Sequence, residues 1–506
     1  MRIPAVTSLA IDNFAGGVIQ TVHSGITNGV IGKYADGRTY ATQRPSVNIF
    51  EDASNTVVDR KGRNVYYWNE VSAHYFVNDD TVYKASYSAA VTNNLSSGTE
   101  KVYFFEIGTY LVILDPENNE GWYISSGSST TLNSITDTEF PPNQTPALQL
   151  TRGGAVLNGI LYVGATNGEL WNSATEDPTS WDGLDFRTAE VNPDDGVMMF
   201  KHADHVAFAG TQTIEFFYDN ANTVGSPLNP RTDINYSVGM IDADTLWSDG
   251  QTTFFCSLNP SGDINVLRLS GFELSKISTP DIDSFLTDSV INSSIQVMGS
   301  GFTAGGRSFY ILTTFIVSGS VSTYQSIVYD QSVNAWYPDW ELMHSGIDNF
   351  PLIGWTQSTA TRAGVGILTN GDLVTILDDQ NPQDTVEASG YFVDDYIEPG
   401  YIEEFDGSGA PIQIEIILGQ VDFGSRGYKY ATNLKPVALK TTNTQTLTVQ
   451  HSDEGNDNYT TGRTIDTSDD REKLTRLGRF RTRNHKLIYA GDEKYEIEAI
   501  ELDVNV

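Results

Sequence analysis

The chain has 506 residues, of which 39% are hydrophobic and 11% aromatic, so it can hold two or three domains or one large repeat architecture with an appendage. Asp and Glu number 65 against 30 Lys and Arg, which gives a formal net charge of −35 at pH 7. A surface of this sign repels phosphate backbones and argues against a protein that grips nucleic acid through a basic groove. A role of the charge in solubility is the alternative interpretation.

The single cysteine, Cys256, leaves no partner for an internal disulfide, and its neighbours in TTFFC predict a buried thiol. The N-terminal segment has no apolar core or small-residue cleavage site of the secretory kind. No run approaches 18 apolar residues, and the strongest one, residues 309–317, suits a buried strand. We therefore expect a protein made in the cytosol, without a membrane span.

Residues 1–60 predict an N-terminal extended segment with frequent Gly and no helical period, which joins a platform region. Residues 61–385 alternate short apolar strands with turns rich in Asn, Ser and Gly, and the later strands begin roughly 45 to 60 residues apart, the size of a four-stranded propeller blade with its loops. Six or seven such units that close a ring predict a β-propeller-like domain. A pair of stacked β-sandwiches is the alternative that this strand pattern allows. The strands of the repeat are expected at residues 74–77, 101–114, 159–164, 205–209, 252–258, 307–315 and 364–368.

The composition changes at residues 378–411, which are acidic and rich in turn residues and predict a domain boundary near 385. Residues 386–506 contain several strands and end in the alternating segment YEIEAIELDV, which predicts a C-terminal β-sandwich or platform domain. The predicted fold class is all-β: a β-propeller-like repeat of six to seven antiparallel units with an appended C-terminal β-sandwich.

The only basic cluster lies at residues 471–486. Arg479, Arg481 and Arg483 stand two residues apart, so on a strand they would project from one face as a cationic stripe. We consider them candidates for docking an acidic partner subunit, with the DNA backbone as a second candidate partner. The alternative is a solvated strand whose charge is balanced by neighbouring acidic residues.

Paired carboxylates invite a glycosidase hypothesis, because two of them across a sugar ring are what hydrolysis requires. In a chain with 65 acidic residues such pairs arise by chance, and most lie in turns where Asp side chains bond the local backbone. The candidate pairs are Asp194 with Asp195, Asp242 with Asp244, Asp281 with Asp283, and Asp378 with Asp379. We predict no catalytic residues and no enzymatic activity.

Metal and cofactor sites are not expected either. His202 and His205 lie close together, but no third ligand follows at metal spacing. Residues 453–457 lack the ligand pattern of an EF-hand loop, which leaves an incidental calcium as the alternative. The chain has no Walker loop and no GxSxG elbow, and Cys256 has no evident histidine partner.

The stretch from Trp181 to Asn220 contains the phrase DF..AE.NPD.G, then an apolar strand, Ala-Gly-Thr and TIEFF. This phrase resembles the middle of the tail hub or nozzle proteins of short-tailed bacteriophages, which are also called packaged DNA stabilisation proteins. The leucine-glycine-arginine phrase with alternating arginines near the C-terminus is similar to the end of the same proteins. The matching residues of the central phrase are Asp185, Phe186, Ala189, Glu190, Asn192, Pro193, Asp194, Gly196, Gly210, Thr213, Ile214, Glu215 and Phe216.

The resemblance implies a structural protein of the virion tail, made in the host cytoplasm and without enzymatic activity. It implies a homo-oligomer, typically a hexamer, that forms a hub below the portal and its adaptor and holds tail fibres or spikes. Such a hub closes and conducts the DNA exit channel, with a separate tail plug or needle as a further partner, and viral DNA passes through it without specific binding. The alternative function is a β-propeller protein that binds or cleaves carbohydrate.

Overall fold

A computed structural model describes residues 2–4, 9–10, 21–22, 25–51, 61–86, 88–126, 130–189, 194–222, 225–259, 262–293, 296–318, 321–337, 340–341, 350–358, 364–378, 383–384, 410–418, 427–453, 458–469 and 471–505. It confirms the predicted fold class. Within these residues the regular structure is almost entirely β, and α1 (Pro280–Ser293) is the single α-helix. Most of the predicted boundary segment, residues 379–382 and 385–409, lies outside the described residues, as do Glu190, Asn192 and Pro193 of the central phrase.

Seven antiparallel units follow one another from Gly62 to Leu377, at the upper end of the six to seven expected. The first holds β8 (Gly62–Trp68), β9 (Ala73–Asn78) and β10 (Thr81–Lys84). The second holds β11 (Tyr103–Ile107), β12 (Tyr110–Asp115), β13 (Glu120–Ile124) and β14 (Asn133–Ser134), followed by the 3-10 turn η1 (Pro141–Asn143). The third holds β15 (Arg152–Leu157), β16 (Ile160–Gly164), β17 (Glu169–Ala174) and β18 (Asp177–Thr188). The fourth holds β19 (Gly196–His202), β20 (His205–Gly210), β21 (Ile214–Asp219) and β22 (Leu228–Tyr236).

The later units have the same plan. The fifth begins after the 3-10 turn η2 (Ala243–Thr245) and holds β23 (Trp247–Ser248), β24 (Thr252–Leu258), β25 (Ile264–Ser270) and β26 (Glu273–Lys276). The sixth holds β27 (Gln296–Ala304), β28 (Arg307–Ser318), β29 (Val321–Asp330) and β30 (Ala335–Tyr337), with β2 (Leu9–Ala10) and β3 (Thr21–Val22) added at its edge. The seventh holds β31 (Leu352–Gln357), β32 (Gly364–Leu368) and β33 (Leu373–Leu377), and its fourth strand is β7 (Ser46–Glu51).

The ring closes through this seventh sheet. β7 pairs antiparallel with β33, from Ser46 opposite Leu377 to Glu51 opposite Leu373. Because β7 precedes the first unit in the chain, the last sheet is complete only when both ends of the repeat meet. The first and seventh units also share an apolar cluster, and comparable clusters fill the other junctions between neighbouring units. Each sheet thus buries both faces, which is why β24 is buried along nearly its whole length and Cys256 with it, as predicted.

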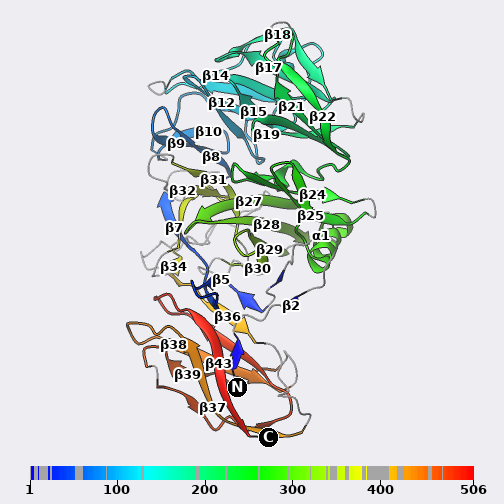
Figure 1. Cartoon of the computed structure of the whole chain (residues 1–506). Coiled ribbons are helices and arrows are strands. Elements are labelled where there is room, and N and C mark those ends of the chain that lie inside the picture. Colours follow the sequence, from blue (N-terminus) through cyan, green and yellow to red (C-terminus); the bar gives the residue numbers. More distant parts are fainter. Residues whose placement is uncertain are drawn as a thin grey trace.

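The C-terminal domain consists of two sheets around a shared apolar core. It lies at one end of the elongated chain, where both termini are also found (Figure 1). One sheet holds β4 (Ile26–Thr27), β36 (Ile414–Ile417), β38 (Thr446–Ser452), β39 (Arg463–Asp466) and β42 (Asn484–Tyr489). The other holds β1 (Arg2–Pro4), β5 (Gly29–Lys33), β6 (Thr39–Gln43), β37 (Lys429–Ala438), β40 (Leu474–Thr475), β41 (Arg479–Phe480) and β43 (Ile497–Asn505). The first 60 residues therefore divide their strands between this domain and the ring.

A buried ion pair lies at the joint between the two domains. Arg44 follows β6 and pairs with Asp384 of β34 (Gln383–Asp384), which in turn pairs with β35 (Ala410–Pro411). Both side chains have no exposed surface. The guanidinium also donates to the carbonyls of Pro45 (2.9 Å) and Glu341, and Asp384 accepts the backbone N–H of Val47 at 3.0 Å. One charged pair therefore fixes three chain segments that are distant in sequence.

Candidate functional site

The first strands of five units, the first four and the seventh, line a cavity of about 300 Å³. Its walls are mainly apolar and aromatic. They are formed by Asn64, Val65 and Tyr66 of β8, Tyr103, Phe104 and Phe105 of β11, Gly153 and Gly154 of β15, Met198, Met199 and Phe200 of β19, and Trp355 and Thr356 of β31. Gly153 has a φ of +72°, and a Cβ atom there would lie 2.2 Å from the carbonyl oxygen of Met199. Glycine is therefore required for the parallel pairing of β15 with β19 that joins the third and fourth units.

A buried lysine ties opposite sides of the ring together. Lys101 precedes β11 in the second unit, and its ammonium donates to the carbonyl oxygen of Gly299 on β27 at 2.7 Å. It also donates to the carbonyl oxygen of Asp244 in η2 at 3.1 Å. The side chain thus links the second unit to the fifth and sixth, across the axis. Burial lowers the pKa of Lys101, an effect that the charges of Asp244 and Asp242 oppose.

Further charged groups surround this lysine. Arg152 of β15 forms an ion pair with Glu100, the residue before Lys101. Asp242 is exposed as a residue, but desolvation by the surrounding protein raises the pKa of its carboxyl, and the neighbouring charge of Asp244 raises it further. Burial likewise raises the pKa of Tyr103 well above its usual range. Cations and carboxylates from the second, third and fifth units thus compensate one another where these units converge.

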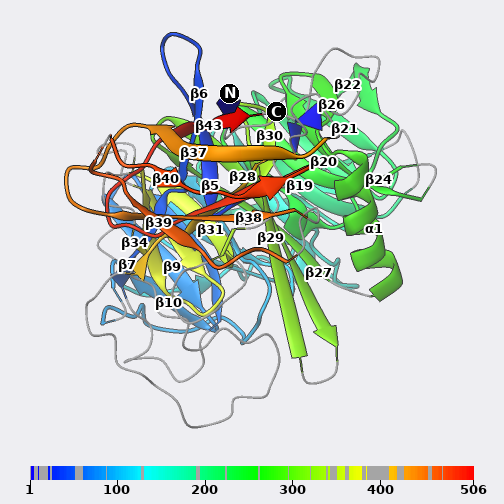
Figure 2. The ribbon, with the colours of Figure 1, turned by 90° about the horizontal axis from the view of Figure 1, so that it is seen from below.

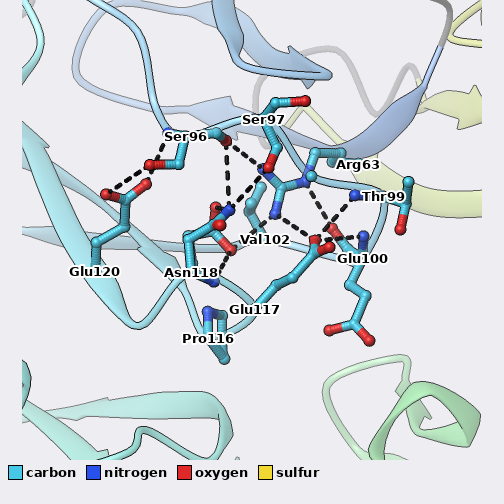
Figure 3. A network of polar contacts seen from close by, with 12 residues as sticks. Arg63, Ser96, Ser97, Thr99, Glu100, Val102, Pro116, Glu117, Asn118 and Glu120 are labelled. Atoms are coloured by element: carbon cyan, nitrogen blue, oxygen red, sulfur yellow. Dashed lines mark hydrogen bonds and ion pairs between the residues drawn. The ribbon is translucent and has the colours of Figure 1, made fainter.

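The buried side chain of Arg63 holds the loop at residues 99–101, which carries Glu100 and Lys101 (Figure 3). Arg63 of β8 donates from Nε to the carbonyl oxygen of Glu100 at 2.7 Å, and from Nη2 to Asp115 at 2.8 Å and Glu117 at 3.3 Å. Glu117 in turn accepts the backbone N–H groups of Thr99 and Glu100, both at 2.9 Å. The network fixes the backbone at residues 99–101 and so positions Glu100 and Lys101 at the axis.

Replacing Lys101 by Met should lower the free energy of unfolding by about 2–3 kcal/mol, because the buried carbonyl group of Gly299 and the partly buried carbonyl group of Asp244 lose their donor. Urea unfolding of the full chain measures the change. Lys201 is exposed on β19 and serves as the matched control, since its replacement by Met removes the same charge without uncovering a buried acceptor. Equal stability of the two variants would show that Lys101 does not tie the ring.

The predicted carboxylate pairs serve local structure where the structure describes them. Asp194 accepts the backbone N–H groups of Gln212 (2.6 Å) and Thr213 (3.1 Å), and Asp242 caps η2 by accepting the N–H of Asp244 at 2.9 Å. Asp283 binds Ser278 and Lys276, and Asp378 pairs with Lys494. Asp379 lies outside the described residues.

The two neighbouring histidines are engaged by ordinary protein groups. His202 contacts the hydroxyl of Thr253 at 3.1 Å and the carbonyl of Gly271 at 2.5 Å, and His205 Nε2 lies 2.8 Å from a guanidinium nitrogen of Arg231. In the part of the chain that the structure covers, no three His, Cys, Asp or Glu side chains are placed to hold a metal ion. Residues 454–457 of the acidic loop lie outside that part. None of the described helices is long and apolar enough to span a membrane.

The structure corrects the expected geometry of the arginine stripe. Arg479 and Arg481 are exposed, and their guanidinium carbons lie 3.5 and 4.5 Å from the ring centre of Tyr428. Arg483 is instead buried, forms a two-pronged ion pair with Asp453 (2.6 and 2.8 Å) and donates to the carbonyl of Leu477. The strand β41 ends at Phe480, so the alternation that would align the three side chains does not extend to Arg483.

The burial of His485 predicts a dependence of stability on pH. The pKa of His485 is lowered from 6.5 to about 3, first by its own burial and then by the charge of the neighbouring Arg483. The folded state keeps this imidazole neutral, whereas the unfolded chain takes up a proton below pH 6.5. Its contribution to stability is therefore complete above pH 6.5 and is lost as the pH falls toward 3, by about 1.4 kcal/mol per pH unit. Urea unfolding of the wild type and of His485→Phe should show that difference in slope, and parallel slopes would contradict it.

Sequence reasoning missed the axial residues Arg63, Glu100 and Lys101. One usable signal is that Lys101 is the only Lys or Arg between residues 85 and 151. A lone cation that begins a strongly apolar strand, KVYFFEIG, is costly to bury without partners, so its position indicates a specific contact. Its acceptors lie about 140 and 200 residues further along the chain, and no local pattern indicates them.

Comparisons with known proteins add the following. A family model described as "Phage_stabilise: Bacteriophage P22 Gp10, beta-propeller" matches residues 30–363, a range that includes the central phrase. No curated protein matches the chain. Solved structures with similarity are exo-β-1,3-galactanase from Phanerochaete chrysosporium (11% identity, 79% of this chain and 95% of that chain, TM-score 0.30) and BamB from Moraxella catarrhalis (11%, 69% and 95%, 0.35). Raptor from Chaetomium thermophilum is similar at 10% identity over 66% of this chain and 29% of that chain, with a TM-score of 0.37.

Proposed function

The chain belongs to the bacteriophage P22 Gp10 β-propeller family, and from this premise we propose that it forms the tail hub or nozzle of a short-tailed phage. The match over residues 30–363 is the observation that carries the proposal. In this role the protein is a structural component of the virion, located in the tail, without catalytic activity. Several copies, typically six, assemble below the portal and its adaptor, hold tail fibres or spikes, and close and conduct the DNA exit channel, together with a tail plug or needle.

The contacts that Lys101 makes across the ring support a particular placement of the DNA. A cavity of about 300 Å³ has the size of a small-molecule site, and Lys101 and its partners cross the space beside it. A duplex cannot pass through such a ring. The exit channel is therefore formed between copies of the chain, and each ring contributes only its outer surface to the channel wall.

The charge of the chain suits such a wall. With a net charge of −35, its outer surface is strongly acidic overall. At physiological salt the Debye length is about 8 Å, so acidic groups close to the duplex repel it without full screening. A wall of this kind conducts DNA without binding it specifically, whereas a basic wall would hold the duplex by counterion release and delay ejection.

Electron microscopy of purified particles labelled with gold-tagged antibody to this chain tests the proposal. Label below the portal vertex is the expected result. Absence of the chain from particles would overturn the hub assignment. If the protein were then found to bind glycans, the alternative of a carbohydrate-binding or carbohydrate-cleaving propeller would take its place.

A further inference from the structure

The charge of this chain is divided unevenly between its two parts. Residues 1–410 contain 17 Lys and Arg against 50 Asp and Glu, a net charge of −33. Residues 411–506 contain 13 Lys and Arg against 15 Asp and Glu, a net charge of −2. Two copies of the chain therefore repel each other over most of their surface, and residues 411–506, which form most of the C-terminal domain, are where that repulsion is weakest.

Within this domain the basic residues gather along one sheet edge. β40 and β41 are short strands that pair with β37, at the edge of the sheet that continues through β43. Figure 2 shows where β40, β37 and β43 lie in the C-terminal domain. The chain that forms them exposes five cationic side chains and gives the edge a positive charge. They are Arg471, Lys473, Arg476, Arg479 and Arg481. We refer to these residues, with Tyr428 and Tyr430, as the Arg–Tyr edge.

Two exposed aromatic rings accompany the cations. Tyr428 and Tyr430 are 48% and 53% exposed, and Tyr430 lies opposite Arg479 in the β37–β41 pair. The guanidiniums of Arg479 and Arg481 both pack over the ring of Tyr428. Cation–π contact restrains the two long side chains, so less conformational entropy is lost when a partner binds them. Exposed Tyr and Arg together are the composition that dominates binding energy at protein interfaces.

We propose that the Arg–Tyr edge docks on the acidic surface of residues 1–410 of a second copy of this chain. Charge complementarity selects this occupant, because each copy carries both the basic edge and a large acidic surface. A duplex is disfavoured, because the net charge of −35 opposes its approach to the rest of the chain. The contact is heterologous, since the edge of one copy meets a different surface of the next, and repeated contacts of this kind build a ring when the rotation closes.

Site-specific photocrosslinking tests the proposal on the purified full-length chain. Benzoylphenylalanine replaces Tyr430, which is exposed and does not carry the stacked arginines. Irradiation at about 50 mM NaCl should link two copies, with the adduct mapping to residues 1–410, and the yield should fall severalfold at about 500 mM NaCl as the charges are screened. Absence of a crosslink between copies at low salt would overturn the proposal.

Matched charge reversals separate this contact from general repulsion. Arg479→Glu should reduce the crosslinking yield by about tenfold, the effect of losing roughly 1.4 kcal/mol at the interface. Lys33→Glu makes the same change of charge at β5, the opposite edge of the same sheet, and should leave the yield nearly unchanged. Equal losses in the two variants would contradict a specific site.

Duplex DNA added to the crosslinking reaction tests DNA as the competing partner of the Arg–Tyr edge. Crosslinks to DNA that displace those between copies would assign the edge to phosphate binding and overturn docking on a second copy. The inference depends on the charges and side chains of the chain and on no virion component. Its failure would leave the gold-labelling result unaffected, and the reverse also holds.

Discussion

Replacing Arg63 by Met is expected to lower the free energy of unfolding by about 3–5 kcal/mol, because the buried carboxylate of Asp115 loses its cation and keeps the hydrogen bonds from Asn118. Neither side chain has exposed surface, so water cannot replace the lost ion pair. The carbonyl of Glu100 loses its donor as well, and with it the loop that presents Lys101 to the axis loses an anchor. Urea unfolding of the full chain, followed by tryptophan fluorescence, measures the loss.

Two further variants keep this prediction testable if Arg63→Met fails to fold. Arg63→Lys retains the charge but cannot serve Glu100, Asp115 and Glu117 together, and it should fold with an intermediate loss of stability. Lys201→Met provides the control, because Lys201 is exposed on β19 and its loss removes one positive charge from a solvated position. If Arg63→Lys were as stable as Lys201→Met, the network would not hold the first two units together.

Replacing Arg44 by Met is expected to cost a similar amount, about 3–5 kcal/mol, because Asp384 is then a buried carboxylate without its cation. The Arg44→Met variant should also differ from the wild type in the number of its unfolding transitions. Arg44 joins segments of the ring and of the C-terminal domain. In the Arg44→Met variant the two domains should therefore unfold in separate transitions, whereas in the wild type they unfold together. Denaturant unfolding monitored by tryptophan fluorescence and by hydrogen exchange of the C-terminal strands distinguishes the two cases.

The double variant Arg44→Met/Asp384→Leu is the matched test of the cause. Removing both charges leaves no uncompensated ion, and an apolar pair of similar volume often restores the stability of a buried ion pair. We expect the double variant to recover most of the loss. A double variant as unstable as Arg44→Met would assign the loss to packing against Phe350, over whose ring the guanidinium lies, and not to the unpaired carboxylate.

Several features of the fold could be predicted from local patterns. Apolar strands bounded by turn residues, at the spacing of a propeller blade, predict the repeated antiparallel units, and the structure contains seven of them. The buried Cys256 follows from its apolar neighbours. The central phrase around Asp185 and Phe216 lies within the range that matches the phage family. These predictions succeeded because each depends on residues close together in the chain.

The burial of Arg483 could not be predicted from the spacing of the three arginines. Spacing of two residues places side chains on one face only while the strand continues, and β41 ends at Phe480. Arg483 then turns inward to Asp453, a residue on a different strand connection, while Arg479 and Arg481 remain outside. No feature of the sequence around residue 480 indicates that the strand is so short, because its length is set by pairing with β37.

The sequence by itself determined the β-class of this protein, the size of its repeat, its acidic character and its relation to a phage family. Tertiary structure decided how the ring closes, through β7 and β33, and which charges meet at its axis, where Lys101 reaches Asp244 and Gly299. The physical reason is the distance along the chain. Alternation, turns and charge act between neighbouring residues, whereas contacts across hundreds of residues depend on packing of the whole ring and leave no local pattern.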